Sequence, residues 1–266
     1  SVLKNCKGSA IAIGNFDGVH KGHQKVFNEA KKFAKKKKIK FGILTFNPLP
    51  VMFFNKKVNN FRLTSENQKF KLFKKHNVNF VVNVKFNKQF SKIVAEKFIK
   101  NIIFMKINPK FIFVSNNFKF GNKRKGNVKL LKKFSEKYGY KLKKISPFKY
   151  KQKTISSTRI RKFLQNGNLS LANKLLARTW SIDGKVTKGK QLGRKLGYRT
   201  CNIYIKNYIL PMAGIYIVKV SIENKKKIYN GIAYFGSRPT FKGKKFFLEI
   251  NIFGIKKNLY QKTLRV

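Results

Sequence analysis

Acidic side chains are scarce in this sequence, and their scarcity is its most unusual feature. The 266 residues include 8 Asp and Glu against 63 Lys and Arg, so the formal net charge is +55 at pH 7. So large a charge strongly self-repels unless anions neutralise it. Two interpretations remain open: the surplus binds RNA or another polyanion, or it reflects compositional drift, because Lys, Asn, Ile and Phe are abundant together.

Cysteines and long apolar runs are also lacking. Cys6 and Cys201 lie far apart, without the spacing of metal ligands, which predicts free thiols and a reducing compartment, either a cytoplasm or an organellar matrix. No uncharged apolar run reaches the length of about 18 residues that crosses a membrane, so we expect no membrane partner. The N-terminal residues show no signal-peptide pattern.

Apolar residues, by contrast, are plentiful enough for two domains. Hydrophobic residues form 42% of the 266-residue chain, with 27 Phe and 10 Tyr, and a single domain usually has about 100–150 residues. In residues 1–150, short apolar runs alternate with segments of helical spacing, which is typical of an α/β domain with a parallel sheet. We expect strands at 9–13, 40–46, 80–84 and 110–114, and helices at 22–36, 65–76, 91–102 and 127–138.

The sequence changes character near residue 180. Two short helices are expected first, one from Ser156 or Ser157 to residue 165 and one at 170–177. Beyond Trp180, stretches of β-branched and aromatic residues punctuated by Gly predict an antiparallel barrel. We therefore expect an α/β domain at 1–175 and a barrel domain at 176–266.

One motif lies directly after the first expected strand. The stretch AIAIGNFDGVHKGHQKVF, residues 10–27, places His20, Gly22 and His23 at the expected start of a helix. The amide groups and positive dipole end of a helix start favour phosphate. Gly22 permits close approach of a nucleotide, and two imidazoles can donate hydrogen bonds to phosphate oxygens. This arrangement predicts a nucleotide-phosphate site.

A second motif, ISSTRIR at residues 155–161, supplies hydroxyls, helix-start amides and guanidinium groups that suit a triphosphate. Together the two motifs resemble the HxGH nucleotidyltransferases, and specifically the bacterial bifunctional riboflavin kinase/FAD synthetases. The resemblance covers nearly all of the chain from Ala10 to Tyr260. It implies an α/β Rossmann-like nucleotidyltransferase domain followed by an all-β Greek-key, flavokinase-like barrel.

The resemblance also implies a reaction in FAD biosynthesis, in which AMP passes from ATP to FMN and pyrophosphate leaves. Mg²⁺ would bridge the phosphates, and His20 and His23 would act as catalytic residues by stabilising developing charge. The residues that the resemblance assigns to ATP and its phosphates in the two domains are Gly14, Phe16, Asp17, Gly22, Ser156, Ser157, Thr158, Arg159, Gly189, Thr200 and Asn202.

Two further segments match the family with substitutions. In TFNPLP at residues 45–50, Asn47 and Leu49 replace a common acid and a common His. In NFKFG, Asn117 replaces an acid, and the resemblance assigns Asn117 and Phe118 to flavin binding. Asn can accept a hydrogen bond but cannot serve as an anion or a base. The resemblance therefore implies flavin-phosphate binding through a segment that lacks the family's acid.

The expected barrel carries a second set of motifs. Residues 184–205 resemble a flavokinase phosphate loop and its PTAN motif, which reads RTCN at residues 199–202. The resemblance assigns Thr200 and Asn202 to Mg²⁺ and ATP phosphate. It assigns the role of catalytic base to Glu249. This carboxylate would accept the proton of the riboflavin hydroxyl that becomes phosphorylated. Riboflavin phosphorylation to FMN is the activity that these motifs imply.

Departures from the family pattern keep a second class of function open. Arg199 replaces a proline, and the given chain ends at LYQKTLRV, where the family usually continues, so we expect phosphorylation of riboflavin to be slower than adenylyl transfer. The alternative function is that of an RNA-binding or ribosome-associated structural subunit derived from this family. The scarcity of acids, including the replacement at Asn117, favours the subunit. The enzyme is favoured by the retention of six residues: His20, His23, Arg159, Thr200, Asn202 and Glu249.

Overall fold

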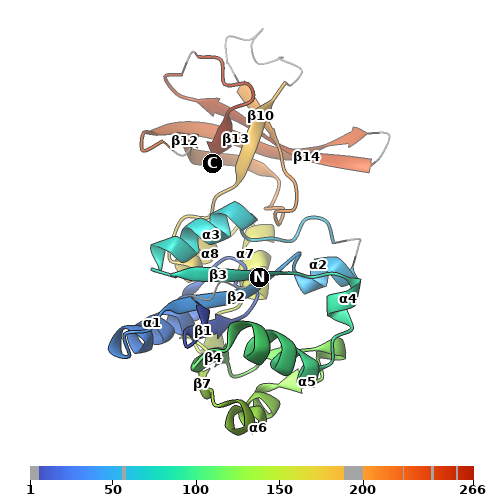
Figure 1. The fold of residues 1–266 in the computed structure, drawn as a ribbon. Helices are drawn as coiled ribbons and strands as arrows, with labels where there is room; N and C mark the ends of the chain where they lie inside the picture. The colour runs from blue at the N-terminus through green and yellow to red at the C-terminus, as the bar shows by residue number, and fades with distance from the viewer. Residues whose placement is uncertain (1–5, 56–57, 189–199, 224, 241–242, 256) are drawn as a thin grey trace. The chain divides into compact units, whose positions relative to one another are not determined.

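The computed structural model describes residues 6–55, 58–188, 200–223, 225–240, 243–255 and 257–266. Contacts divide the chain into two compact units (Figure 1). Unit 1 comprises Ser1–Val58 and Lys69–Ser156, and unit 2 comprises Asn59–Gln68 and Ser157–Val266. These are groupings by contact, and the domain boundary between residues 175 and 176 stays a prediction from sequence.

Unit 1 is built on a parallel five-stranded sheet with the strand order β3-β2-β1-β4-β7. Each neighbouring pair in this sheet is parallel, which confirms the Rossmann-like α/β fold. The five strands are β1 Ala10–Ile13, β2 Phe41–Asn47, β3 Phe80–Lys85, β4 Phe111–Ser115 and β7 Lys141–Ile145. Four were predicted to within one residue at either end, and β7 was missed.

Helices and two short hairpins complete unit 1. The helices are α1 Lys21–Lys36, α2 Pro50–Phe54, α3 Glu66–Lys75, α4 Lys88–Ser91, α5 Ala95–Lys97, the π-helix η2 Phe98–Ile107, the 3-10 turn η3 Asn122–Arg124 and α6 Val128–Tyr138. The hairpins pair β5 Lys119–Phe120 with β6 Gly126–Asn127, and β8 Lys149–Tyr150 with β9 Lys153–Thr154. The contact division falls within α3, between Gln68 and Lys69.

The helix expected at 91–102 was wrong as a single element. Asn87 caps the short helix α4, because its Oδ1 accepts a hydrogen bond of 2.8 Å from the amide of Phe90, and α4 ends at Ser91. The helical course resumes in α5 and continues as η2 with π-helical winding. The apolar spacing correctly indicated helical structure in this region. The cap at Asn87 and the break in the helix after Ser91 were not predicted from the sequence.

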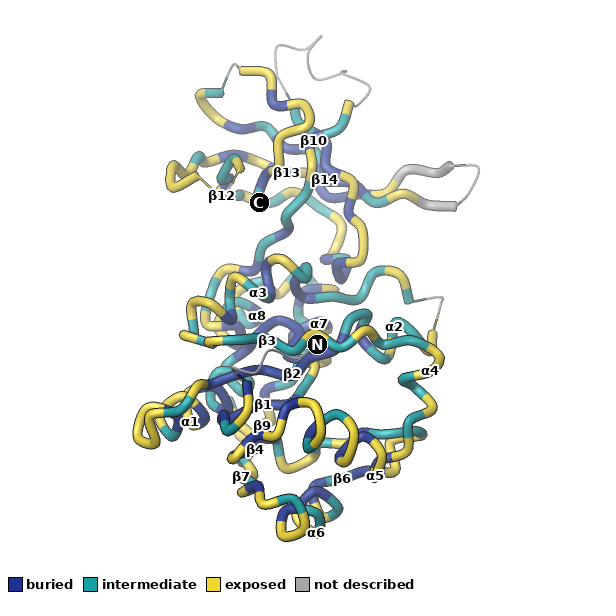
Figure 2. The backbone as a smooth tube through the Cα atoms, viewed as in Figure 1, coloured by how far each residue is buried: buried dark blue, intermediate teal, exposed yellow. Residues whose placement is uncertain are grey.

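Apolar side chains cover both faces of the central strands β1, β2 and β4, and the tube in Figure 2 has the colour of buried residues along β2. Along β1, Ile11 and Ile13 pack into the cluster that contains residues of η2 and α6, whereas Ala10 and Ala12 pack into the cluster that contains residues of α1. Alternate residues of a strand point to opposite faces, so a strand covered on both sides is apolar throughout. The loops of the first site follow the carboxyl ends of two of these central strands, β1 and β4.

Unit 2 contains a closed barrel with the strand order β10-β11-β14-β13-β12-β15. Each neighbouring pair is antiparallel. Strands β12, β13 and β14 follow one another as hairpins while β11 lies beside β14, which is a Greek-key arrangement, as predicted. The elements are α7 Ser157–Gln165, α8 Leu169–Leu176, β10 Asp183–Thr187, β11 Thr200–Tyr204, β12 Gly214–Ile222, β13 Ile228–Thr240, β14 Gly243–Ile252 and β15 Thr263–Arg265.

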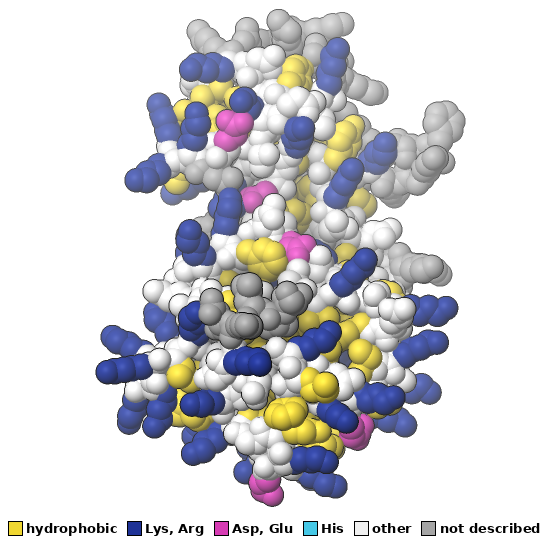
Figure 3. Space-filling model, viewed as in Figure 1, with side chains coloured by type: hydrophobic (Ala, Val, Ile, Leu, Met, Phe, Trp, Pro, Cys, Tyr) yellow, Lys and Arg dark blue, Asp and Glu magenta, His cyan; other side chains and the backbone are white. Residues whose placement is uncertain are grey.

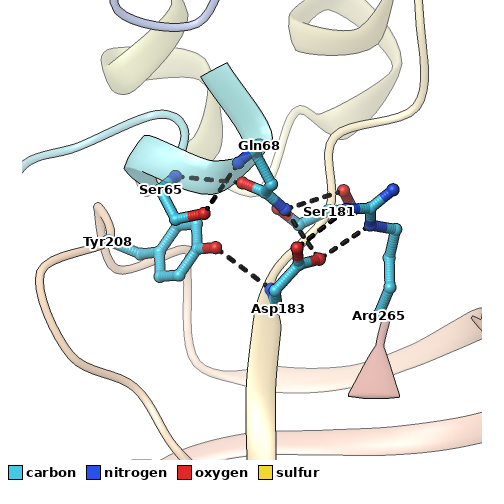
Figure 4. A network of polar contacts seen from close by, with 6 residues as sticks. All are labelled: Ser65, Gln68, Ser181, Asp183, Tyr208 and Arg265. Carbon is cyan, nitrogen blue, oxygen red and sulfur yellow. Dashed lines mark hydrogen bonds and ion pairs between the residues drawn. The ribbon is translucent and has the colours of Figure 1, made fainter. Parts of the chain in front are cut away.

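A polar network ties the segment Asn59–Gln68 to the rest of unit 2 (Figure 4). Gln68 donates from Nε2 to the carbonyl of Ser181 over 3.1 Å and to Oδ1 of Asp183 over 2.9 Å. Asp183 also accepts two hydrogen bonds of 2.7 Å from the guanidinium of Arg265. Bidentate pairs of this kind are strong and directional, so the segment is held by specific contacts.

In the ranges that the structure describes, each helix is too short or too polar to cross a membrane. Cys6 and Cys201 are both free, as the sequence predicted.

Candidate functional site

The first site is a strained turn that joins β1 to α1. Phe16, Gly18 and Val19 have φ angles of 50°, 81° and 42°, and the first and last of these side chains are buried. A positive φ is unfavourable for a bulky residue and most of all for a β-branched one such as Val19. Backbone strain of this kind concentrates at functional sites. The turn therefore has a conformation that the rest of unit 1 must impose.

Both predicted histidines lie at the end of this turn. His20 is the N-cap of α1, and its Nδ1 accepts a hydrogen bond of 3.3 Å from the amide of His23. The two imidazoles stack with centroids 3.6 Å apart and an interplanar angle of 20°. The edge of Phe16 meets the His23 ring at 5.2 Å. His20 and His23 are thus fixed side by side at the start of a helix.

Gly22 and Gly14 leave space that a side chain would fill. A Cβ at Gly22 would lie 3.1 Å from the His20 ring and 3.5 Å from the carbonyl oxygen of Ile155, and a Cβ at Gly14 would lie 3.0 Å from the Phe16 ring. Asp17 is buried in the same turn. The structure therefore brings together the predicted residues Gly14, Phe16, Asp17, His20, Gly22 and His23.

The predicted flavin residues follow β4, the strand beside β1. Asn117 is exposed, and its Oδ1 accepts a hydrogen bond of 2.9 Å from the hydroxyl of Ser115. Phe118 is half-buried and stacks on Phe120 with centroids 5.4 Å apart. Because β1 and β4 are parallel neighbours, both loops leave the carboxyl edge of the sheet, where ligands of open α/β folds bind.

The hydroxyl-rich motif begins where unit 1 ends. Ile155 is buried and Ser156 is partly exposed, and unit 2 begins with Ser157, the first residue of α7. Thr158 is exposed, and the guanidinium of Arg159 lies 5.5 Å from the Phe163 ring. These residues keep polar groups at the surface of α7, as a phosphate-binding role requires.

Arg161, the second arginine of this motif, has a different environment. Its guanidinium lies 3.6 Å from the centroid of the Phe61 ring, and its Nε donates a hydrogen bond of 2.8 Å to the Phe61 carbonyl. The residue is buried. These contacts give Arg161 a structural role within unit 2.

The second site lies on one face of the barrel. Thr200 and Asn202 are two residues apart on β11, and Asn202 lies opposite Glu249 of β14, so the three side chains share a face. The Thr200 hydroxyl donates a hydrogen bond of 2.9 Å to Oε1 of Glu249. The structure thus brings together the predicted kinase residues, apart from Gly189, which lies outside the described residues, as does Arg199.

Aromatic side chains occupy positions beside Glu249 on that face. Tyr234 of β13 lies opposite Glu249 and is 46% exposed. Its ring lies across Gly236, where a Cβ would be 2.6 Å from the ring. Tyr234 also contacts Phe247, with centroids 6.0 Å apart. An exposed aromatic surface beside a carboxylate suits a flat, apolar ring with a polar tail.

The donor atoms of Thr200, Asn202 and Glu249 on this face include oxygens, the ligands that Mg²⁺ prefers. Within the described ranges, no cluster of three or more His, Cys, Asp or Glu side chains could hold a metal ion. Mg²⁺ does not need such a cluster, because it keeps several waters and binds through a few hard oxygens together with substrate phosphates. The oxygens of Thr200 and Asn202 fit that requirement.

One side chain near the first site, Lys69, was not predicted from the sequence, and it contacts Thr45 of the segment at residues 45–50. Lys69 of α3 is buried, and its Nζ donates a hydrogen bond of 3.2 Å to Oγ1 of Thr45. Thr45 in turn donates to the carbonyl of Asn15 over 3.1 Å. In a chain with 63 Lys and Arg, nothing in the sequence distinguishes this lysine from its exposed neighbours.

The fold and the two sites define a class: a Rossmann-like nucleotidyltransferase joined to a flavokinase-type barrel. A family model for FAD synthetase matches residues 3–159, and one for riboflavin kinase matches residues 176–266. The chain belongs to the bacterial-type bifunctional riboflavin kinase/FAD synthetase family.

Relatives with that double description resemble the chain over nearly its whole length. The bifunctional riboflavin kinase/FMN adenylyltransferase of Buchnera aphidicola subsp. Schizaphis graminum is 44% identical, across 97% of this chain and 83% of the relative. The Haemophilus influenzae protein of the same description is 35% identical, across 100% and 85% of the two chains. The Escherichia coli K12 protein is 32% identical, across 98% and 83%.

A solved structure has the same fold. The crystal structure of a protein described as a macrolide-efflux protein from Streptococcus pneumoniae matches with a TM-score of 0.83 and 28% sequence identity. The match covers 99% of this chain and 87% of that chain. Both units of the described chain therefore have counterparts in a known structure.

Proposed function

We propose that the chain makes FAD in two steps, phosphorylating riboflavin to FMN in the barrel of unit 2 and transferring AMP from ATP to FMN at the β1–α1 turn. The observation that carries the transferase proposal is the stacked pair His20 and His23, at a centroid distance of 3.6 Å, at the start of α1. Family membership supports both steps.

In the transferase step, an oxygen of the FMN phosphate attacks the α-phosphorus of ATP. A new P–O bond forms, the bond from the α-phosphorus to the bridging oxygen breaks, and pyrophosphate leaves. No covalent intermediate with the protein is needed, so the protein positions the reactants and neutralises charge. Residues Gly14, Phe16, Asp17 and Gly22 would shape the ATP site, and Ser156, Ser157, Thr158 and Arg159 would bind the leaving pyrophosphate.

The hydrogen bonding of His20 supports its proposed role. Because Nδ1 of His20 accepts from the amide of His23, the proton of the neutral ring is on Nε2, which is then a donor. The amide groups at the first turn of α1 add a positive potential. A donor held at a helix start by its own cap is preorganised for the charge that develops on the phosphates.

In the kinase step, Glu249 would accept the proton of the terminal ribityl hydroxyl while that oxygen attacks the γ-phosphorus of ATP. The bond between the γ-phosphorus and its bridging oxygen breaks, and ADP leaves. Thr200 and Asn202 would hold Mg²⁺, which would neutralise charge on the phosphates.

Each site would also contact its flavin through an aromatic ring. In the barrel, the exposed ring of Tyr234 would contact the isoalloxazine of riboflavin. In the transferase site, Asn117 and Phe118 would contact the flavin of FMN.

Our proposal about the relative rates of the two steps rests on the sequence. Arg199 replaces a proline of the family motif directly before Thr200, and arginine is charged and lacks the fixed φ angle of proline. We therefore propose that riboflavin phosphorylation is the slower step. Initial rates of FMN formation from riboflavin and of FAD formation from FMN, measured on one preparation, test this order; a faster kinase step would contradict it.

A polyanion such as RNA is the second candidate partner, because of the net charge of +55. Lys and Arg side chains are spread over both units on the face that Figure 3 shows. The descriptions of the relatives named above mention neither RNA nor a ribosome. Filter binding of RNA at several salt concentrations tests this role: a steep salt dependence with tight binding at physiological salt would support it, and feeble binding would leave drift as the explanation.

The free thiols Cys6 and Cys201 support a reducing compartment, either a bacterial cytoplasm or an organellar matrix. Fractionation of the source cells, with disulfide-bonded and thiol proteins as markers, tests this placement.

A further inference from the structure

A buried lysine stands apart from the other basic residues of the chain. Lys69 is 2% exposed, and among the residues that the structure describes it is the only lysine classed as buried. Burying an ammonium group is costly unless it is paired and hydrogen-bonded. Lys69 lies in the fourth position of α3, which begins at Glu66, and a positive charge near a helix start is unfavourable as well. The contacts that Lys69 makes must therefore offset the cost of burying its charge.

The contacts of Lys69 lead to the turn of the transferase site. Its Nζ donates to Oγ1 of Thr45 over 3.2 Å, and the Thr45 hydroxyl, which is fully buried, donates to the carbonyl of Asn15 over 3.1 Å. Asn15 directly precedes Phe16, the first residue of the turn with a positive φ. Two hydrogen bonds in series therefore connect the ammonium group to the strained backbone.

The same helix also supports the turn through apolar contacts. Phe73, one turn farther along α3, meets the Phe16 ring edge-on with centroids 6.2 Å apart. Phe16 in turn meets the ring of His23 at 5.2 Å. A displacement of Asn15 and Phe16 would thus be transmitted to His23 by direct contact.

We infer that Lys69, acting through Thr45, is a positioning residue for adenylyl transfer: it holds the turn that places His20 and His23. This inference rests on the proposed transferase function. Because the imidazoles are proposed to stabilise charge that develops in the transition state, misplacing them lowers kcat more than it raises KM. A misplacement of about 1 Å at such a site can cost roughly a hundredfold in rate.

The test compares Lys69→Met with Lys71→Met. Methionine fills nearly the same volume without the charge or the donor, and Lys71 is an exposed lysine of the same helix. We expect Lys69→Met to lower kcat for FAD formation from FMN by about tenfold to a hundredfold, with little change in KM and with FMN formation from riboflavin retained. Lys71→Met should match the unmodified protein in both reactions.

Thr45→Val provides a second, independent arm, because it removes the relay and leaves Lys69 in place. We expect a similar fall in kcat, and no further fall in the double variant, since the two residues act in series. An unchanged kcat in Lys69→Met would overturn the inference. So would a parallel loss of both activities and of Tm in Thr45→Val, which would mean a general structural role. If the unmodified protein forms no FAD, the proposed function itself fails.

Discussion

The hydroxyl of Thr200 donates a hydrogen bond of 2.9 Å to Oε1 of Glu249, across neighbouring strands of the barrel. The contact orients a carboxylate beside the side chain proposed to bind Mg²⁺ and phosphate. Only 8 acidic residues occur in the chain, so a carboxylate in this position carries more weight than it would in an ordinary protein.

Replacing Glu249 with Gln should abolish most kinase activity. Gln keeps the size of the side chain but cannot accept a proton, and loss of a general base costs about a hundredfold to ten-thousandfold in rate. Formation of FAD from supplied FMN should be unchanged. The matched control is Glu223→Gln, because Glu223 is an exposed acid of the same barrel whose carboxylate pairs with Lys262 at 3.1 Å. Equal kinase rates for the two variants would contradict the assignment of Glu249.

Replacing His23 with Ala should lower FAD formation from FMN by about tenfold to a thousandfold, the loss expected for one donor that stabilises developing charge. Kinase activity should persist. The control is His76→Ala, since His76 packs against the Phe27 ring and has no proposed role in the chemistry. A steady-state assay of pyrophosphate release measures both variants, and an unchanged rate for His23→Ala would remove the motif from the mechanism.

Replacing Asp183 with Asn should destabilise unit 2. Arg265 would lose a charged bidentate partner, and Gln68 would keep only part of its network. The side chains of Arg265 and Asp183 are 32% and 16% accessible, so water partly screens the pair. We therefore expect the free energy of unfolding to fall by about 1–3 kcal/mol, which is less than for a fully buried pair. Urea titration followed by fluorescence of Trp180, the single tryptophan, measures it.

The control for Asp183→Asn is Glu223→Gln, which removes an ion pair whose side chains are 49% and 40% accessible. Exposed pairs contribute about 0–1 kcal/mol, so this variant should unfold at nearly the same urea concentration as the unmodified protein. A larger shift for Glu223→Gln than for Asp183→Asn would show that burial of the Asp183 pair adds nothing.

Both cysteines should react slowly with thiol reagents near neutral pH. Burial raises the pKa of Cys201, and burial likewise raises the pKa of Cys6 against the opposing effect of Lys40. The folded chain therefore disfavours the thiolate, which is the reactive form. The labelling rate with iodoacetamide should rise at a higher pH than for a free thiol and should increase on unfolding. Fast labelling of the folded protein at pH 7 would contradict this prediction.

The sequence predicted the fold where apolar spacing carries the signal. The central strands of unit 1 and the barrel strands after Trp180 were found because buried strands are apolar or regularly alternating. Strand β7, KLKKI, was missed because it is an edge strand rich in lysine; lysine protects sheet edges but conceals their pattern. The joining of Asn59–Gln68 to unit 2 depends on long-range contacts, such as Gln68 with Asp183, that no local pattern records.

The sequence likewise predicted the parts of the candidate sites that depend on local spacing. The grouping of His20, Gly22 and His23 follows from their spacing at a helix start. The contact between Thr200 and Glu249 depends on the strand register, in which Asn202 lies opposite Glu249, and spacing alone does not give that register. Lys69 could not be found at all, because burial is what distinguishes it from the exposed lysines around it.

The most direct test of the account is a time course of flavins formed from riboflavin, ATP and Mg²⁺ by the purified protein, separated by chromatography. We predict that FMN appears first and is converted to FAD, that His23→Ala accumulates FMN, and that Glu249→Gln forms FAD only when FMN is supplied. Absence of both products from the unmodified protein, in a preparation that binds RNA tightly at physiological salt, would contradict the account and favour the structural subunit.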